Sequence, residues 1–314
     1  MTRKELQEEI LKLKKDNNVT ILAHYYQPLE IQEIADFLGD SLGLSRIAKE
    51  KANTEYIIFA GVIFMAETAS ILNQDKHILV PARDAFCDLA SFLTPELVDE
   101  FKKKYPDLPV ITYVNSTAAV KAKSDICCTS SNAVKITRKI KEEFNSDTVL
   151  FGPDSNLADY TEQISGIKTI KMPANGHCYV HSQLTIKDVK KARKEHPNIK
   201  ILAHPECIRE VRDSVDFVGS TAQMYNFVKQ NSSKEDEFLI GTEVGLLERL
   251  AMDFLKNKFH LIKIKMVCNE MKKNNLESIK YLLENLDNNS LEIKVPKNIS
   301  QKAIKPINKM LKYS

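Results

Sequence analysis

Short apolar runs recur along the chain, and several end in polar side chains that can carry or exchange a proton. Three of these runs, at residues 19–26, 109–115 and 199–206, resemble one another. Each is followed by further apolar runs of four to six residues, separated by stretches of about ten residues with helical periodicity. This alternation predicts strands joined by helices, and therefore βαβ units with a parallel sheet buried on both faces.

The third region shows the pattern most fully. Its expected strands are residues 200–204, 215–219, 238–241 and 261–266, and its expected helices are residues 206–214, 221–230 and 245–255. The later strands of the other two regions are expected at residues 148–151 and 169–172, and at 56–60 and 77–80. We also expect a helix before residue 18.

The three regions are repeats of one unit. Their anchor residues, His24, Tyr113 and His204, are separated by 89 and 91 residues. An aspartate follows each anchor by 12 residues and a hydroxyl residue by 17, namely Asp36, Asp125 and Asp216, then Ser41, Ser130 and Thr221. We therefore expect an α/β protein with three homologous three-layer α/β/α domains around a pseudo-threefold axis. The expected boundaries are 1–87, 88–178 and 179–268, with the tail 269–314 completing the first domain.

Three of the six cysteines occur at nearly the same position in each repeat. Cys87, Cys178 and Cys268 follow their anchors by 63, 65 and 64 residues, which core packing alone does not explain. Three cysteines brought together suggest a metal centre: zinc with a fourth protein ligand, or a [4Fe–4S] cluster with one open iron. His181 is the obvious fourth ligand for zinc, but a role behind the cysteine or a place on the surface is equally open. The remaining cysteines, Cys127, Cys128 and Cys207, are expected to be buried thiols.

The repeated polar residues should lie where parallel sheets bind ligands, beyond the carboxyl ends of the strands. Those that end the first strands are His24, Tyr26, Tyr113, Asn115, His204 and Glu206. Ser41, Ser130 and Thr221 follow the second strands and are expected to cap helices, whose N-termini attract anions. Around a pseudo-threefold axis, all of these side chains converge on one central pocket.

Composition restricts the class of partner. The 314-residue chain has a formal net charge of +3, which argues against a nucleic-acid-binding arm. It contains no run of about 18 apolar residues, so we expect no membrane span. Its charged start lacks the apolar core of a signal peptide, so the expected location is the cytoplasm.

Five segments resemble the quinolinate synthase family: AHYYQ at residues 23–27, CCTSSNA at 127–133, GHCYVH at 176–181, HPEC at 204–207 and CNEMKKN at 268–274. They occur in the family's order and spacing from about residue 18 onward. One small departure is Asn275, where the family usually has threonine.

The resemblance implies three similar α/β domains around a cavity and a [4Fe–4S] cluster held by Cys87, Cys178 and Cys268, with one iron open as a Lewis acid. It implies condensation of iminoaspartate with dihydroxyacetone phosphate to give quinolinate, phosphate and water for NAD synthesis. L-aspartate oxidase and aspartate dehydrogenase are the candidate suppliers of the imine.

By this analogy, Tyr26 and Glu206 are the candidates for acid–base work, with His204 and Tyr113 also in the catalytic set. His24 and His204 are expected to hold phosphate or carboxylate oxygens and to move protons near neutral pH. Tyr113 and Asn115 would orient the substrates, while Ser41, Ser130 and Thr221 would bind their anionic groups. The alternatives are a different open-iron hydro-lyase, a non-catalytic iron–sulfur sensor and a zinc-stabilised scaffold.

Overall fold

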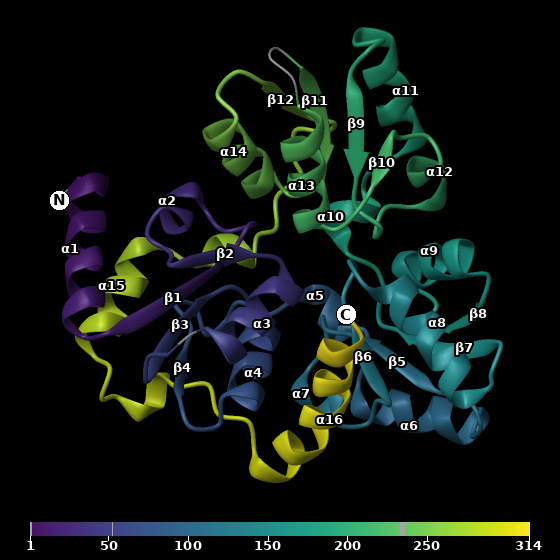
Figure 1. The fold of residues 1–314 in the computed structure, drawn as a ribbon, viewed down its shortest axis with the longest axis horizontal. Helices are drawn as coiled ribbons and strands as arrows, with labels where there is room; N and C mark the ends of the chain where they lie inside the picture. The colour runs from purple at the N-terminus through teal and green to yellow at the C-terminus, as the bar shows by residue number, and fades with distance from the viewer. Residues whose placement is uncertain (1, 52, 233–235) are drawn as a thin grey trace.

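The computed structural model describes residues 2–51, 53–232 and 236–314, and within them the chain forms three four-stranded parallel sheets (Figure 1). Their strand orders are β2-β1-β3-β4, β6-β5-β7-β8 and β10-β9-β11-β12. Each sheet therefore places its first strand second in the order, beside the second and third strands. The expected α/β class with three repeated sheets is confirmed.

The strands of the first sheet are β1 (Val19–His24), β2 (Phe37–Gly39), β3 (Tyr56–Ala60) and β4 (His77–Leu79). The helices that belong with it are α1 (Arg3–Asp16), α2 (Leu29–Gln32), α3 (Ser41–Glu50) and α4 (Ile63–Leu72). The strands of the second sheet are β5 (Val110–Tyr113), β6 (Ile126–Cys128), β7 (Thr148–Gly152) and β8 (Lys168–Lys171). The helices of this part are α5 (Asp88–Ser91), α6 (Pro95–Lys104), α7 (Ala118–Lys121), α8 (Ala133–Phe144) and α9 (Ser155–Ser165).

The strands of the third sheet are β9 (Lys200–Ala203), β10 (Phe217–Val218), β11 (Glu237–Gly241) and β12 (Lys258–Leu261). Its helices are α10 (Tyr179–Ser182), α11 (Ile186–Glu195), α12 (Arg209–Arg212), α13 (Thr221–Asn231) and α14 (Val244–Asp253). The tail contains the 3₁₀ turn η1 (Met271–Lys273), α15 (Leu276–Glu284), the 3₁₀ turn η2 (Asn289–Leu291) and α16 (Lys297–Tyr313).

The first strand of each sheet is apolar because helices cover both of its faces. All six residues of β1 are buried. Two consecutive residues of this strand, Ile21 and Leu22, belong to different apolar clusters on the two sides of the sheet. Successive side chains of a strand point to opposite faces, so a strand covered on both sides needs apolar residues throughout.

The three repeated aspartates do not line a site; each one bonds the first strand of its own sheet. The carboxylates of Asp36, Asp125 and Asp216 each accept a hydrogen bond from a backbone N–H of the first strand, at 2.7–2.8 Å. Each satisfies a buried backbone donor beside the short second strand. The repeat spacing of these aspartates therefore has a structural cause.

Two expected elements of the third unit are wrong in extent. The strand expected at residues 261–266 lies earlier, as β12, and its last paired residue, Leu261, faces Ile240 near the end of β11. The residues after Leu261 form the loop that leads to Cys268. The helix expected at residues 206–214 is reduced to the single turn of α12.

The tail contacts more than one unit. Helix α15 packs against α1, whereas α16 packs against α4 as well as α7, α8 and β6 of the second unit. The C-terminus lies near the middle of the molecule (Figure 1). The domain boundaries at residues 87 and 178 stay predictions. In the described part of the chain, no helix combines the length and apolar character that crossing a bilayer requires.

Candidate active site

The three repeat-related cysteines occupy equivalent places in the fold. Each lies just before a short helical turn, namely α5, α10 and η1, and its carbonyl oxygen accepts an N–H from that turn. Cys87 and Cys178 have nearly the same backbone angles, with φ −84° and ψ 117° for one and φ −83° and ψ 118° for the other. Cysteines at equivalent positions of the sequence repeats thus lie in loops of similar backbone conformation.

These cysteines line one cavity together with every other residue that the sequence analysis proposed for the site. The shared lining residues are His24, Tyr26, Ser41, Cys87, Tyr113, Asn115, Ser130, Cys178, His204, Glu206, Thr221 and Cys268. They come from all three units, so the cavity exists only where the units meet. The structure therefore brings together all of the predicted site residues.

The three thiols suit a cation that binds sulfur. All three are free, and burial raises the pKa of Cys87 to about 12 and that of Cys268 to about 11. The pKa of Cys178 is also raised well above its ordinary value, mainly by burial. Backbone N–H groups of the following turn nevertheless bond each sulfur and favour its anionic form. A bound metal would remove the protons and take up this negative charge. The donor set therefore fits a thiolate-bound cluster.

Cys127, Cys128 and Cys207 are buried away from the cavity, as expected for thiols that serve as core residues. The Cys207 thiol donates to the carbonyl oxygen of Gly241.

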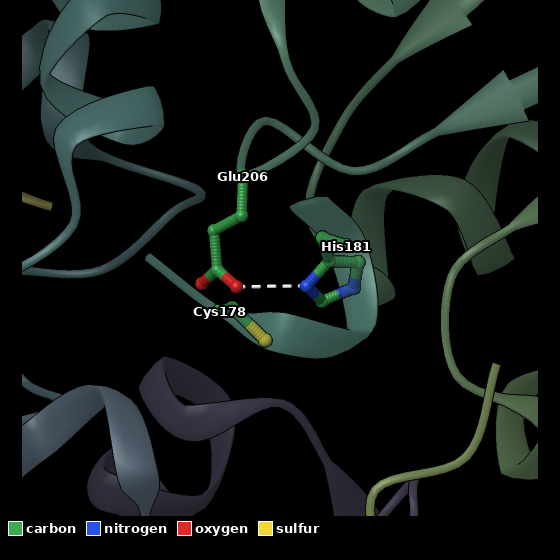
Figure 2. Close-up of side chains that lie close together, drawn as sticks. All are labelled: Cys178, His181 and Glu206. Carbon is green, nitrogen blue, oxygen red and sulfur yellow. Dashed lines mark hydrogen bonds and ion pairs between the residues drawn. The ribbon is translucent and has the colours of Figure 1, made fainter. Parts of the chain in front are cut away.

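His181 is close to Cys178 and Glu206, and the possible ligand atoms of these three residues lie within 4.8 Å of one another (Figure 2). Both of its ring nitrogens, however, already have partners. Nδ1 is 2.8 Å from a carboxylate oxygen of Glu206, and Nε2 is 2.8 Å from the hydroxyl of Thr242. His181 is 2% exposed, so the surface alternative is wrong. Its occupied nitrogens also make it a poor fourth ligand for zinc.

A continuous chain of hydrogen bonds links Tyr26 to Glu206. Thr221 donates to the phenol of Tyr26, which lies 2.7 Å from the Thr242 hydroxyl. A carboxylate can only accept, so His181 donates from Nδ1 to Glu206, and in the neutral ring Nε2 then accepts from Thr242. Tyr26 therefore donates to Thr242, and all of these donors point toward Glu206.

Glu206 is the acceptor at the end of this chain and is 3% exposed. It also accepts a hydrogen bond of 2.6 Å from the phenol of Tyr113. Burial alone would raise the pKa of Glu206, but His204, His181 and the hydrogen bonds from His181 and Tyr113 outweigh it. The resulting pKa is about 2. Burial raises the pKa of Tyr26 and of Tyr113 well above the ordinary value, so both phenols keep their protons.

His24 and His204 have the same local geometry. The Nδ1 atom of each accepts the backbone N–H of the residue two positions later, Tyr26 or Glu206. The proton of each neutral ring is therefore on Nε2. Burial lowers the pKa of both histidines to about 3. They are neutral N–H donors at pH 7, so the expectation that they move protons near neutrality is wrong.

Comparison with known proteins identifies the family of this chain. Residues 8–312 match the family model described as quinolinate synthetase A protein. The quinolinate synthase of Pyrococcus abyssi is 46% identical over 310 residues, which cover 99% of this chain and 100% of that protein. Those of Thermotoga maritima and Clostridium kluyveri are 46% identical over 303 and 307 residues, with 96% and 98% of this chain and 98% and 97% of the relatives covered.

This chain belongs to the quinolinate synthase family. Members of the family are enzymes of NAD biosynthesis, and the resemblance read from the five sequence segments is confirmed. The cavity described above is thus the candidate active site of a quinolinate synthase family member.

Ser41, Ser130 and Thr221 do not cap helices, although the sequence analysis expected them to. The caps of α3 and α13 are Asp40 and Ser220, so Ser41 and Thr221 are the first residues of these helices. A cap must accept the free N–H groups of the first turn, and the preceding residue is the one placed to do so. Ser130 lies two residues before Asn132, the residue that precedes α8. All three hydroxyl residues still line the cavity.

Thr242 is the residue of the hydrogen-bond chain from Tyr26 to Glu206 that sequence reasoning missed. It follows β11 and is fully buried, but the corresponding positions after β3 and β7 are Gly61 and Pro153. Because no hydroxyl recurs there, the repeat contains no signal for it. The link from Tyr26 to His181 depends on tertiary structure alone.

Proposed function

We propose that this chain is a quinolinate synthase that condenses iminoaspartate with dihydroxyacetone phosphate, releasing quinolinate, phosphate and water. The observation that carries the proposal is the convergence of three equivalent cysteines and one chain of acid–base groups on the same cavity. Full-length similarity to quinolinate synthases supports it.

Cys87, Cys178 and Cys268 are the residues that would hold a [4Fe–4S] cluster. When bound, the cluster supplies Lewis acidity through an iron that no cysteine occupies. The carboxylate of Glu206 and the neutral imidazoles of His24 and His204 face the same cavity and remain available to substrate.

Tyr26 and Glu206 act as the two ends of a proton relay. When the phenol oxygen of Tyr26 takes a proton from substrate, its own proton passes to Thr242, then through His181 to Glu206. Each group in this path already donates to the next, so no side chain has to reorient. The reverse movement returns a proton to a leaving hydroxyl, which ring formation with loss of water requires.

Tyr113 keeps its proton and donates to Glu206, which holds the carboxylate in place.

The anionic groups of the substrates meet neutral donors. His24 and His204 offer Nε2–H groups, and the helices α3 and α13 begin beside the cavity with Ser41 and Thr221. Helix N-termini favour anions through their free N–H groups and dipole. Asn115 adds an acceptor for an N–H or O–H group of substrate, because its buried amide oxygen has no hydrogen-bond partner among the described residues.

The test begins with iron, sulfide and zinc analysis of protein purified without oxygen. We expect about four iron and four sulfide per chain, lost in Cys87→Ala, Cys178→Ala and Cys268→Ala but kept in the matched control Cys207→Ala. Quinolinate is then assayed from iminoaspartate and dihydroxyacetone phosphate. One zinc without sulfide would overturn the cluster and favour the zinc scaffold.

A cluster without quinolinate formation would favour the alternatives. Dehydration of a hydroxy acid by the same protein would identify it as a hydro-lyase. Absence of turnover with either kind of substrate would favour the non-catalytic iron–sulfur sensor. Adding L-aspartate oxidase or aspartate dehydrogenase to the assay tests whether either supplies the imine. Cell fractionation tests the predicted cytoplasmic location.

A further inference from the structure

Two buried carboxylates lie directly behind two of the three cysteines. Asp154 and Glu243 are both 0% exposed, and each precedes a helix, α9 or α14. One oxygen of Asp154 accepts the backbone N–H of Cys178 at 3.1 Å, and one oxygen of Glu243 accepts that of Cys268 at the same distance.

The other oxygen of each carboxylate accepts an N–H from the first turn of its own helix. Asp154 bonds the N–H of Leu157 at 2.6 Å, and Glu243 bonds that of Gly245 at 2.7 Å. One side chain thus joins a rigid helix to the loop that carries a cysteine. Without it, two buried backbone donors would lose their partner.

These positions are equivalent in the fold, and the first unit departs from the pattern. The first residue of each helix, Ile63, Ser155 or Val244, donates its N–H to the carbonyl two residues before the cysteine, at 2.8–3.0 Å. The residue before Ile63 is Val62, which is 2% exposed and makes no side-chain hydrogen bond to the helix. The Cys87 loop therefore has the common backbone bond but no carboxylate.

We propose that Asp154 and Glu243 are positioning residues, each of which holds one cysteine loop in its binding conformation before the cluster arrives. The loops of Cys178 and Cys268 are preformed in this way, whereas the Cys87 loop depends on apolar packing around Val62. The proposal rests on the proposed function in one respect, namely that these cysteines hold a cluster.

Amide hydrogen exchange on the full-length chain, with and without iron, tests the preformed loops. We expect Asp154→Asn to speed exchange in the peptide containing Cys178 by about tenfold or more, with the Cys268 peptide unchanged. Glu243→Gln should give the opposite pattern. Each amide side chain places an NH₂ group against a backbone donor, which breaks one of the two bonds without a large change in volume. Glu243 also lies 2.9 Å from the ammonium group of Lys272, so Glu243→Gln removes this ion pair as well.

Iron release to a chelator from the cluster-loaded protein gives the second readout. Groups that orient metal ligands typically change metal affinity by about 10- to 100-fold, and we expect release to quicken by that factor in both variants. The matched control is Thr2→Ala, which removes the cap of α1 and lies far in the sequence from Cys87, the first cysteine. It should lower stability without changing either readout.

If the Cys178 and Cys268 peptides exchange equally fast in each variant, or if Thr2→Ala also quickens iron release, the positioning role is overturned and ordinary helix capping remains. If the wild-type chain binds no cluster, the cofactor part of the proposed function fails. The exchange comparison still decides whether the two carboxylates hold the loops.

Discussion

Acid should destabilise this protein through two buried histidines. His24 and His204 are 4% and 3% exposed, and burial, reinforced by Lys272 and His181 respectively, lowers the pKa of each to about 3. In the unfolded chain the pKa of histidine is about 6.5. The folded value is the lower one, so protons bind the unfolded chain first. The two histidines therefore leave the free energy of unfolding unaffected above about pH 6.5 and lower it as the pH falls from there toward 3.

The size of the effect follows from proton uptake. Between pH 6 and pH 5 the unfolded chain binds nearly one proton on each histidine, while the folded chain binds almost none. The free energy of unfolding therefore falls by about 2–3 kcal/mol over this unit for the pair, and by about half of that for one histidine. A change of this size is a substantial part of the stability of a typical protein.

Urea unfolding of the metal-free chain, followed by circular dichroism from pH 7.5 to 5, measures this slope directly. The chain contains no tryptophan, so backbone signal is the suitable probe. His204→Gln should reduce the slope by about one proton, whereas the exposed-residue control His260→Gln should leave it as in the wild type. If the wild type and His204→Gln have the same slope, the argument that His204 is neutral because it is buried is wrong.

Three substitutions test the site and the junction of the units. Glu206→Gln should keep the cluster but lower kcat by about 10²- to 10⁴-fold, because the amide cannot take up the relayed proton; normal kcat with normal iron content would remove Glu206 from the mechanism. Thr242→Val should lower kcat about tenfold or more by separating Tyr26 from His181, with recovery in Thr242→Ser; equal rates in the two variants would contradict the relay. Gly245→Ala places a methyl group 2.6 Å from the carbonyl oxygen of Tyr25, and should destabilise the chain by about 1–3 kcal/mol in thermal unfolding; an unchanged melting temperature would show that the two units adjust freely.

Local pattern was sufficient for the parallel sheets. Strands such as β1 are buried on both faces, and this requirement appears in the sequence as continuous apolar runs. The limits of short elements were less predictable, because the end of β12 depends on where β11 stops. The pattern of Lys263, Ile264 and Lys265 contains no information about that partner.

The repeat made the candidate site accessible to sequence reasoning. Equivalent loops in three homologous units keep their ligands at equal spacing, so spacing alone distinguishes Cys87, Cys178 and Cys268 from the three other cysteines. Side chains that occur in only one unit leave no such mark, and for this reason Thr242 was missed.

The sequence by itself thus determined the class of fold, the three-unit organisation and the repeated residues at the cavity, because each depends on a periodic pattern along the chain. Tertiary structure alone decided how those residues act. It placed His24 and His204 where burial keeps them neutral, and it gave His181 two partners from segments 25 and 61 residues away. Ionisation states and hydrogen-bond chains depend on what surrounds a group in space, and in this protein those surroundings come from three units that meet only after folding.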